Sequence, residues 1–97
     1  MGEDSYRLQL YVAGNTKRSL RTVRNIRRIC DDRLADGYTL EVFDLYQQPE
    51  LASRVQLSAA PTLIKLLPLP VRRLVGDMAD SDKVLSSLGL ATAKTVT

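Results

Sequence analysis

The chain has 97 residues, of which 44% are apolar and 26% are charged, and these values are typical of one ordinary globular domain. It has no histidine and one cysteine, Cys30, which rules out Ser–His and Cys–His catalysis, an internal disulfide and a cysteine-built zinc site. The net charge of +3 is mild, no apolar run is long enough for a membrane span, and we expect neither a cofactor nor a bound metal.

The two ends of the chain differ from the part between them. Residues 1–6 are acidic and polar and lack the basic and apolar segments of a signal peptide, so a reducing cytoplasm is the expected setting. We expect residues 1–6 to be a flexible N-terminus and the small, polar residues 91–97 to be a disordered tail. Residues 7–90 then form a single domain.

The first half of that domain predicts a strand, a helix and a second strand. Apolar and polar residues alternate at period two over residues 7–13, which indicates a strand. Asn15 or Thr16 can cap a helix over residues 19–34. The apolar stripe of this helix recurs at spacings of three and four and consists of Leu20, Val23, Ile26, Ile29, Cys30 and Leu34. Residues 38–45, rich in aromatic and β-branched side chains, predict the second strand.

The second half predicts a short helix, two strands and a last helix. The short helix covers residues 50–57, the strands cover 62–67 and 71–75, and the last helix runs from residues 80–82 to 88. Pro49 suits the first turn of the short helix. The side chains that we expect to turn inward are Leu51, Val55 and Leu57 in the short helix and Val84, Leu85 and Leu88 in the last one.

The resulting order, β-α-β-α-β-β-α, describes an α/β domain of the thioredoxin-like type. Its first half requires a right-handed crossover and therefore a parallel pair of strands. Its second half requires a hairpin, and this hairpin is weakly encoded, because Pro68 and Pro70 cannot donate to a ladder of hydrogen bonds.

A thioredoxin-like redox site would lie where the first strand meets the first helix. Residues 14–19 contain no cysteine, and Cys30 falls on the apolar stripe, where it is expected to be a buried small hydrophobe. We therefore do not expect thiol–disulfide chemistry. The segment around Ala60 and Pro61 resembles the loop that carries a cis proline in thioredoxin-like proteins. The alternative is a trans proline that begins a strand.

Basic residues gather on one face of the first predicted helix, opposite its apolar stripe. They are Lys17, Arg21, Arg24 and Arg28. Such a face is either simply solvated or docks onto an acidic protein surface. Nucleic acid is not an expected partner, because no basic and aromatic interleaving and no recognised motif is present. Arg72 and Arg73 either join this surface or pair with Asp44 or Asp77.

Three segments together carry a resemblance to a known family. They are LYVAGNT at residues 10–16, APTL at residues 60–63 and the pattern PxPVRRxxGD at residues 68–77. Their order and spacing resemble the KaiB family of small circadian-clock proteins, from about residue 7 to residue 88. No single segment is specific, but the combination is.

The resemblance implies a binding protein and not an enzyme. KaiB-family proteins dock onto the N-terminal ATPase ring of KaiC, an autophosphorylating hexamer, and in cyanobacteria they help to sequester KaiA and displace the KaiB-like sensor domain of the histidine kinase SasA. They also change fold. The ground state, usually a tetramer, has the order β-α-β-β-α-α-β, whereas the binding-competent monomer is thioredoxin-like. A homodimer or homotetramer and either fold are therefore open for this chain.

The resemblance also implies which residues would act. The family uses the short second helix and the turn after it to bind KaiC, and the corresponding positions here are Gln48, Pro49, Leu51, Arg54, Val55 and Gln56. The basic residues Lys17, Arg21, Arg24 and Arg28 would contribute electrostatic steering. The region of the cis proline and the fold switch contains Pro61, Pro68, Pro70, Ser87 and Gly89.

The sequence departs from the family pattern at several of these positions. Gln56 stands where the family has a lysine at the KaiC interface, and Glu41 replaces the lysine used toward KaiA. Ser87 and Gly89 replace a glycine that helps to hold the ground state and a nearby aspartate. KaiC-like binding is thus the expected role, and KaiA is a doubtful partner.

Two other functions remain open at this stage. One is the KaiB-like sensor domain of a SasA-type histidine kinase, and the more remote one is a thioredoxin-like oxidoreductase without its cysteines.

Between residues 48 and 88 the local signals conflict, since the run at 62–67 fits a strand or a buried helix. Such conflict is typical of chains in which two packings differ by little free energy.

Overall fold

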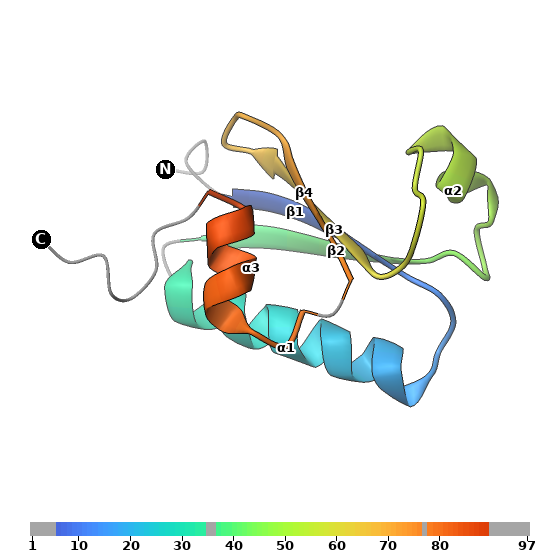
Figure 1. The fold of residues 1–97 in the computed structure, drawn as a ribbon, viewed down its shortest axis with the longest axis horizontal. Helices are drawn as coiled ribbons and strands as arrows, with labels where there is room; N and C mark the ends of the chain where they lie inside the picture. Colours follow the sequence, from blue (N-terminus) through green and yellow to red (C-terminus); the bar gives the residue numbers. More distant parts are fainter. Residues whose placement is uncertain (1–5, 35–36, 77, 90–97) are drawn as a thin grey trace, which may run out of the picture.

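Strands and helices follow one another in the predicted order. The computed structural model describes residues 6–34, 37–76 and 78–89. Its elements are β1 (Tyr6–Val12), α1 (Lys17–Arg33), β2 (Tyr38–Asp44), α2 (Glu50–Arg54), β3 (Thr62–Leu67), β4 (Arg72–Val75) and α3 (Ser81–Ser87). Figure 1 shows α1 and α3 against the sheet and α2 beyond its end.

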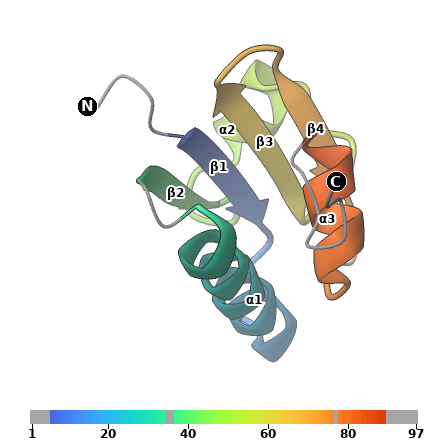
Figure 2. The ribbon, with the colours of Figure 1, turned by 90° about the vertical axis from the view of Figure 1, so that its left-hand side faces the viewer.

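The strands form one mixed sheet in the order β2-β1-β3-β4, and Figure 2 shows the four strands side by side in this order. The β1–β2 pair is parallel, as the α1 crossover requires, and β3 is antiparallel to both β1 and β4. This is the thioredoxin-like arrangement and not the order β-α-β-β-α-α-β. The β3–β4 hairpin forms because Pro68 and Pro70 lie in the connection between the strands, outside the ladder.

One face of the sheet carries the main core. Leu8, Leu10 and Leu63 contribute from the sheet, and α1 and α3 cover them with buried side chains that include Ile26, Ile29, Cys30, Val84, Leu85 and Leu88. The inward positions predicted for α3 are confirmed. On the opposite face Tyr11 stacks on Phe43, with ring centroids 5.1 Å apart.

The predicted apolar stripe of α1 is wrong at its first position. Leu20 is 50% exposed, whereas Ser19 and Thr22 are buried. The buried face of the helix therefore begins with Ser19, Thr22 and Ile26, so it starts one residue before Leu20, where the predicted stripe began. The reason is steric: at this end α1 faces the loop that carries Ala60 and Pro61, and both hydroxyl residues line the narrow space between them.

The boundaries of the helices differ from the prediction by up to three residues. Helix α1 begins two residues early, after Thr16, whose Oγ1 accepts the Ser19 N–H at 3.1 Å. Helix α3 begins after Asp80, whose carboxylate accepts the amides of Asp82 and Lys83. Helix α2 ends at residue 54 and not at 57. Its predicted inward side chains, Leu51, Val55 and Leu57, are only half-buried.

Of the residues predicted to form a flexible N-terminus and a disordered tail, the structure describes Tyr6 alone. Tyr6, expected to belong to a flexible terminus, begins β1. Residues 1–5 and the tail predicted over 91–97 lie outside the described residues.

Candidate protein-binding surface

Helix α2 begins in a tight turn at the end of β2. The amides of Gln47 and Gln48 both donate to the Asp44 carbonyl at 3.0 Å. The Asp44 carboxylate accepts the amides of Gly14 and Tyr46, each at 2.9 Å, and so ties this turn to the loop between β1 and α1. Pro49 then leads into the helix with no side-chain cap. The start of α2 is therefore held by its connection to two strands.

The end of α2 is a Schellman turn with an unusual residue. The Leu57 amide donates to the Ala52 carbonyl at 2.8 Å, and the Gln56 amide donates to the Ser53 carbonyl at 3.1 Å. Gln56, which follows the C-cap residue Val55, has φ +58, in the left-handed region where glycine is usual. Among the described non-glycine residues it is the one with positive φ.

Arg73 of β4 holds this turn. Its Nη2 donates to the Val55 carbonyl at 2.6 Å and its Nη1 donates to the Gln56 carbonyl at 3.1 Å. Sequence reasoning missed this role and gave Arg73 to the basic surface or to an ion pair with Asp44 or Asp77, of which Asp77 lies outside the described residues. The alternation along β4, which places Arg73 on the face away from the main core, was the available signal, but its partners lie far away in the sequence.

The predicted partner-binding residues lie together around α2. Gln48, Pro49, Arg54 and Gln56 are exposed, and Leu51 and Val55 are half-buried. The surface is thus polar with two aliphatic side chains at its centre. Such a composition matches the anatomy of a modest protein interface.

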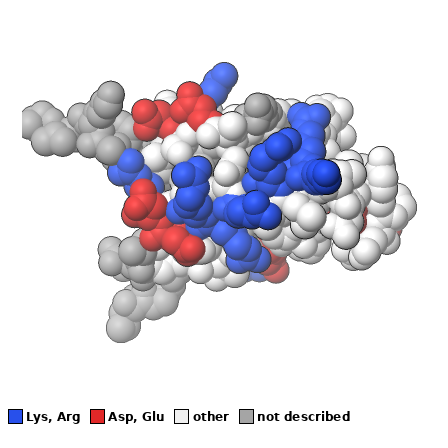
Figure 3. Space-filling view, turned by 90° about the horizontal axis from the view of Figure 1, so that it is seen from below, with Lys and Arg blue, Asp and Glu red and all other residues white. Residues whose placement is uncertain are grey.

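The predicted steering residues form a separate surface on α1, which covers one face of the sheet, whereas α2 lies beyond the end of the sheet. Lys17, Arg21, Arg24 and Arg28 are all exposed on α1. Figure 3 shows basic side chains gathered across the middle of that face. The ion pairs within the described residues are Arg7–Glu41 at 3.9 Å and Arg33–Asp32 at 3.6 Å, so none of the four steering residues takes part in one.

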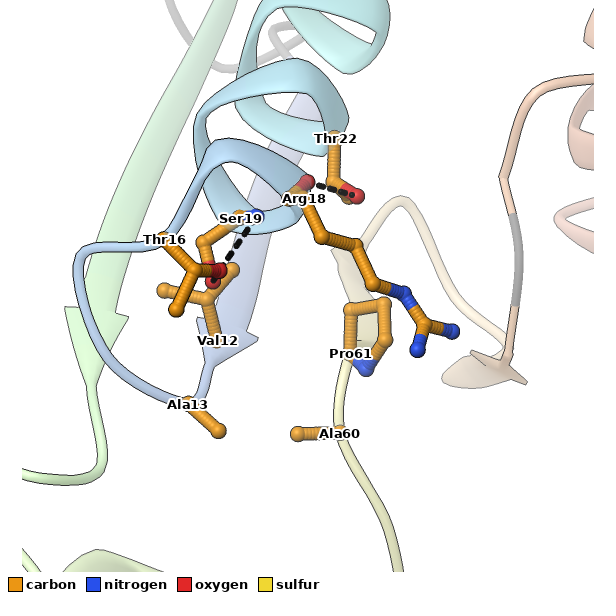
Figure 4. Close-up of a pocket in the computed structure, with 8 residues that line it drawn as sticks. All are labelled: Val12, Ala13, Thr16, Arg18, Ser19, Thr22, Ala60 and Pro61. Atoms are coloured by element: carbon orange, nitrogen blue, oxygen red, sulfur yellow. Dashed lines mark hydrogen bonds between the residues drawn. The ribbon is translucent and has the colours of Figure 1, made fainter.

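A small cavity of about 110 Å³ lies where thioredoxin-like proteins carry their redox site. Figure 4 shows it between the start of α1 and the loop at Ala60 and Pro61. Its hydroxyl groups are engaged in local hydrogen bonds: Thr16 Oγ1 caps α1 through Ser19, and Thr22 Oγ1 donates to the Arg18 carbonyl within the helix at 3.0 Å. Its lining residues include no cysteine, so the arrangement offers no thiol for disulfide exchange.

Cys30 is buried in the main core, away from this cavity. Burial, together with a smaller effect of the Asp31 carboxylate and a partial offset by Arg27, raises the pKa of its thiol to about 11. The thiol is therefore neutral at physiological pH and a poor nucleophile. In the part of the chain that the structure describes, no group of His, Cys, Asp and Glu side chains fits a metal site, and no helix is long and apolar enough to cross a membrane.

Comparison with known proteins identifies the family. The model of the KaiB domain matches residues 9–90. The chain belongs to the KaiB family.

Several KaiB proteins align with this chain over most of their length. The circadian clock oscillator protein KaiB of Prochlorococcus marinus (strain MIT 9312) is 46% identical, over 89% of this chain and 82% of that protein. The circadian clock protein KaiB3 of Synechocystis sp. (strain ATCC 27184 / PCC 6803 / Kazusa) is 43% identical, over 86% of this chain and 81% of its own length.

Solved structures agree on the fold. The N-terminal domain of Synechococcus elongatus SasA superposes with a TM-score of 0.73 at 26% identity, covering 89% of this chain and 85% of that one. Chloroplastic thioredoxin z superposes with a TM-score of 0.68 at 14% identity, covering 91% and 79%, which shows the fold alone. The thioredoxin-like prediction is confirmed.

The residues assigned in the sequence analysis to the region of the cis proline and the fold switch lie in three places. Pro61 is buried beside the small cavity, and Pro68 and Pro70 are exposed in the β3–β4 connection; the peptide bonds before all three are cis, so the cis bond expected at Pro61 is confirmed. Ser87 ends α3. Gly89 has φ +79, and a Cβ there would lie 3.1 Å from Arg72 Nε. The lack of a side chain at Gly89 therefore leaves room for the Arg72 guanidinium.

Proposed function

We propose that this KaiB-family chain is a non-catalytic adaptor that binds a KaiC-type ATPase ring and regulates its phosphorylation or output. The KaiB-domain match over residues 9–90 is the observation that carries the proposal. The thioredoxin-like arrangement supports it, because the resemblance assigns ring binding to that state. A cytoplasmic setting, in which such a ring would be found, belongs to the same proposal.

The docking surface in this proposal is α2 with its exit turn, namely Gln48, Pro49, Leu51, Arg54, Val55 and Gln56. Val55 is half-buried between the exposed side chains of Arg54 and Gln56. An aliphatic centre with a polar rim can exclude water on binding. The basic face of α1 points elsewhere, so it acts by attracting an acidic partner and raising the rate of encounter.

Two substitutions separate these roles in a binding assay with a purified KaiC-type ring. Val55→Asp is expected to raise the dissociation rate and weaken binding by about 2 kcal/mol, because it places a charge in the aliphatic centre. Ser86→Asp adds the same charge at an exposed position of α3 and is expected to leave binding unchanged. If the ring binds parent and Val55→Asp alike, α2 is not the docking surface.

Steering is measured by the dependence on salt. Arg24→Glu is expected to slow association at low ionic strength and to have little effect at high ionic strength. Lys83→Glu, an equal charge change at an exposed position of α3, serves as the control. A loss of binding with Arg24→Glu at every salt concentration would show that α1 itself is the docking surface.

Self-association and a change of fold complete the proposal. Leu67, Leu69 and Val71 are exposed around the β3–β4 connection, and a dimer or tetramer would cover such an apolar surface. Light scattering that finds only monomer at high micromolar concentration would reject this part. KaiA is left out of the proposal as a partner, because Glu41 occupies the position of the lysine used toward it.

A second candidate function is the KaiB-like sensor domain of a SasA-type kinase, which the TM-score of 0.73 with the SasA N-terminal domain favours. The two functions differ in conformational behaviour. A KaiB-type adaptor would show a second set of backbone NMR resonances or an oligomer, whereas a SasA-type sensor domain would show one set and remain monomeric.

A further inference from the structure

Helix α2 cannot hold its own conformation. It has five residues and no buried side chain. Helices shorter than about 12 residues are marginal in water, because the cost of nucleation is not recovered by so few hydrogen bonds. Whatever presents the α2 surface in a fixed geometry must therefore come from outside the helix.

Arg73 makes a contact of this kind at the end of the helix. On β4 it is paired with Ile64 of β3, and its guanidinium reaches the carbonyls of Val55 and Gln56. Carbonyls at the end of a helix have no partner within the helix, and a basic side chain there satisfies them and complements the helix dipole. The planar fork of arginine can serve both carbonyls at once, which a lysine cannot do with the same geometry.

These two carbonyls flank the one residue in this turn whose backbone conformation is unusual. They belong to the peptide groups immediately before and after the Cα of Gln56, the residue with φ +58. A side chain other than glycine is disfavoured in this conformation. By holding both flanking peptide groups, Arg73 fixes both backbone dihedrals of Gln56 and so selects the left-handed turn over extended alternatives.

We propose that Arg73 is a positioning residue that couples the β3–β4 hairpin to the α2 surface, so that the surface is presented only while β4 is paired with β3. This inference rests on the proposed function, since it assigns the regulation of the same surface. Any rearrangement that removes β4 from the sheet would withdraw the guanidinium and release the turn at Gln56. Binding would then require the turn to form again, and the apparent affinity would fall with the fraction of molecules that have it formed.

The first experiment uses the chain without a partner and measures amide hydrogen exchange. In Arg73→Gln, the amides of Gln56 and Leu57 are expected to exchange at least about 10-fold faster, because the turn opens more often. Arg73→Lys keeps the charge and is expected to be intermediate. Arg72→Gln changes the neighbouring arginine, which lies beside Gly89, and is expected to leave both amides as in the parent.

A compensating substitution separates positioning from general stability. Asparagine tolerates the left-handed region better than glutamine and keeps the carboxamide. In the Arg73→Gln background, Gln56→Asn is therefore expected to restore much of the lost protection at Leu57. The exchange of amides within β1 serves as the measure of global stability in every variant. Equal acceleration in β1 and at Leu57 would mean that Arg73 merely stabilises the whole fold, which overturns the proposal.

The second experiment measures binding to the KaiC-type ring. Arg73→Gln is expected to weaken binding about 10-fold, and Gln56→Asn is expected to recover part of that loss. If Val55→Asp weakens binding and Arg73→Gln does not, the coupling is wrong and the proposed function stands. If neither weakens binding, α2 is not the docking surface and its regulation by Arg73 fails with it. A parent chain that does not bind the ring at all refutes the proposed function itself. Unchanged exchange at Gln56 and Leu57 in Arg73→Gln refutes the tether irrespective of binding.

Discussion

Gly14 lies in the loop between β1 and α1 and is held by two features of the structure. Its φ is +87, and a Cβ at this position would lie 3.0 Å from Cδ2 and Cε2 of Tyr46. Gly14→Ala therefore tests both the backbone conformation and the contact with the ring. Its amide hydrogen bond to Asp44 is retained in the variant.

The expected loss of stability follows from these two features. An alanine in a left-handed conformation costs about 1–2 kcal/mol, and the reduced freedom of the unfolded chain offsets about 0.4–1 kcal/mol of this. The Tyr46 side chain is 75% exposed and can rotate away from a new methyl group, so the contact adds only a few tenths. We expect a net loss of about 1 kcal/mol, which corresponds to a decrease in Tm of about 4–8 °C for a domain of this size.

Urea unfolding followed by circular dichroism measures this free energy, and a second glycine provides the control. Gly76 has φ +107 and no atom within 4 Å of a built Cβ, so Gly76→Ala carries the backbone cost without the contact. The part of the loss at Gly14 that comes from the contact with the ring should vanish in a Tyr46→Ala background. A Gly14→Ala variant as stable as the parent would refute the backbone argument. A loss above about 3 kcal/mol would show that the ring cannot move aside.

Two further predictions concern buried titratable groups. Burial and the Arg72 charge lower the pKa of Lys65, whose Nζ donates to the Pro68 carbonyl at 2.6 Å, so its charged form is destabilising and the free energy of unfolding should rise with pH between the lowered pKa and 10.5. Lys65→Met is expected to raise Tm at pH 7, with an advantage that shrinks toward pH 10.5, and an advantage independent of pH would contradict this cause. Cys30 should resist iodoacetamide at pH 7.5 in the native state and react only on unfolding, and the chain should show no turnover in an insulin-reduction assay. Rapid alkylation of the folded chain would disprove the burial argument.

Local patterns were sufficient for most elements because their causes lie within a few residues. The run at residues 62–67 became β3 with the predicted bounds. Thr16 and Asp80 cap their helices through amides two or three residues away, which is a distance that a sequence pattern can record. Family membership was likewise readable from three short segments, because it depends on the identity and spacing of residues and not on how they pack.

The composition of the candidate surface was also readable in part. The resemblance drew attention to residues 48–56, and these do lie together, because they are nearly consecutive in the chain. Their presentation was not readable, since α2 ends at residue 54 in a turn that uses a left-handed glutamine. A helical propensity scale gives no reason to expect that conformation at Gln56.

The remaining features depend on segments that are distant in sequence. Leu20 faces outward because the Pro61 loop approaches the first turn of α1, and Arg73 reaches Val55 because β4 is paired with β3. The choice between the two orders of elements has the same origin. Local signals over residues 48–88 fit both orders, and the pairing of β3 with β1, in which Leu63 lies opposite Leu10, distinguishes them. The sequence by itself thus determined the family, the elements and the lack of a cysteine at residues 14–19. The tertiary pairing of strands decided which side chains hold α2 in place, because those contacts exist only after distant segments have met.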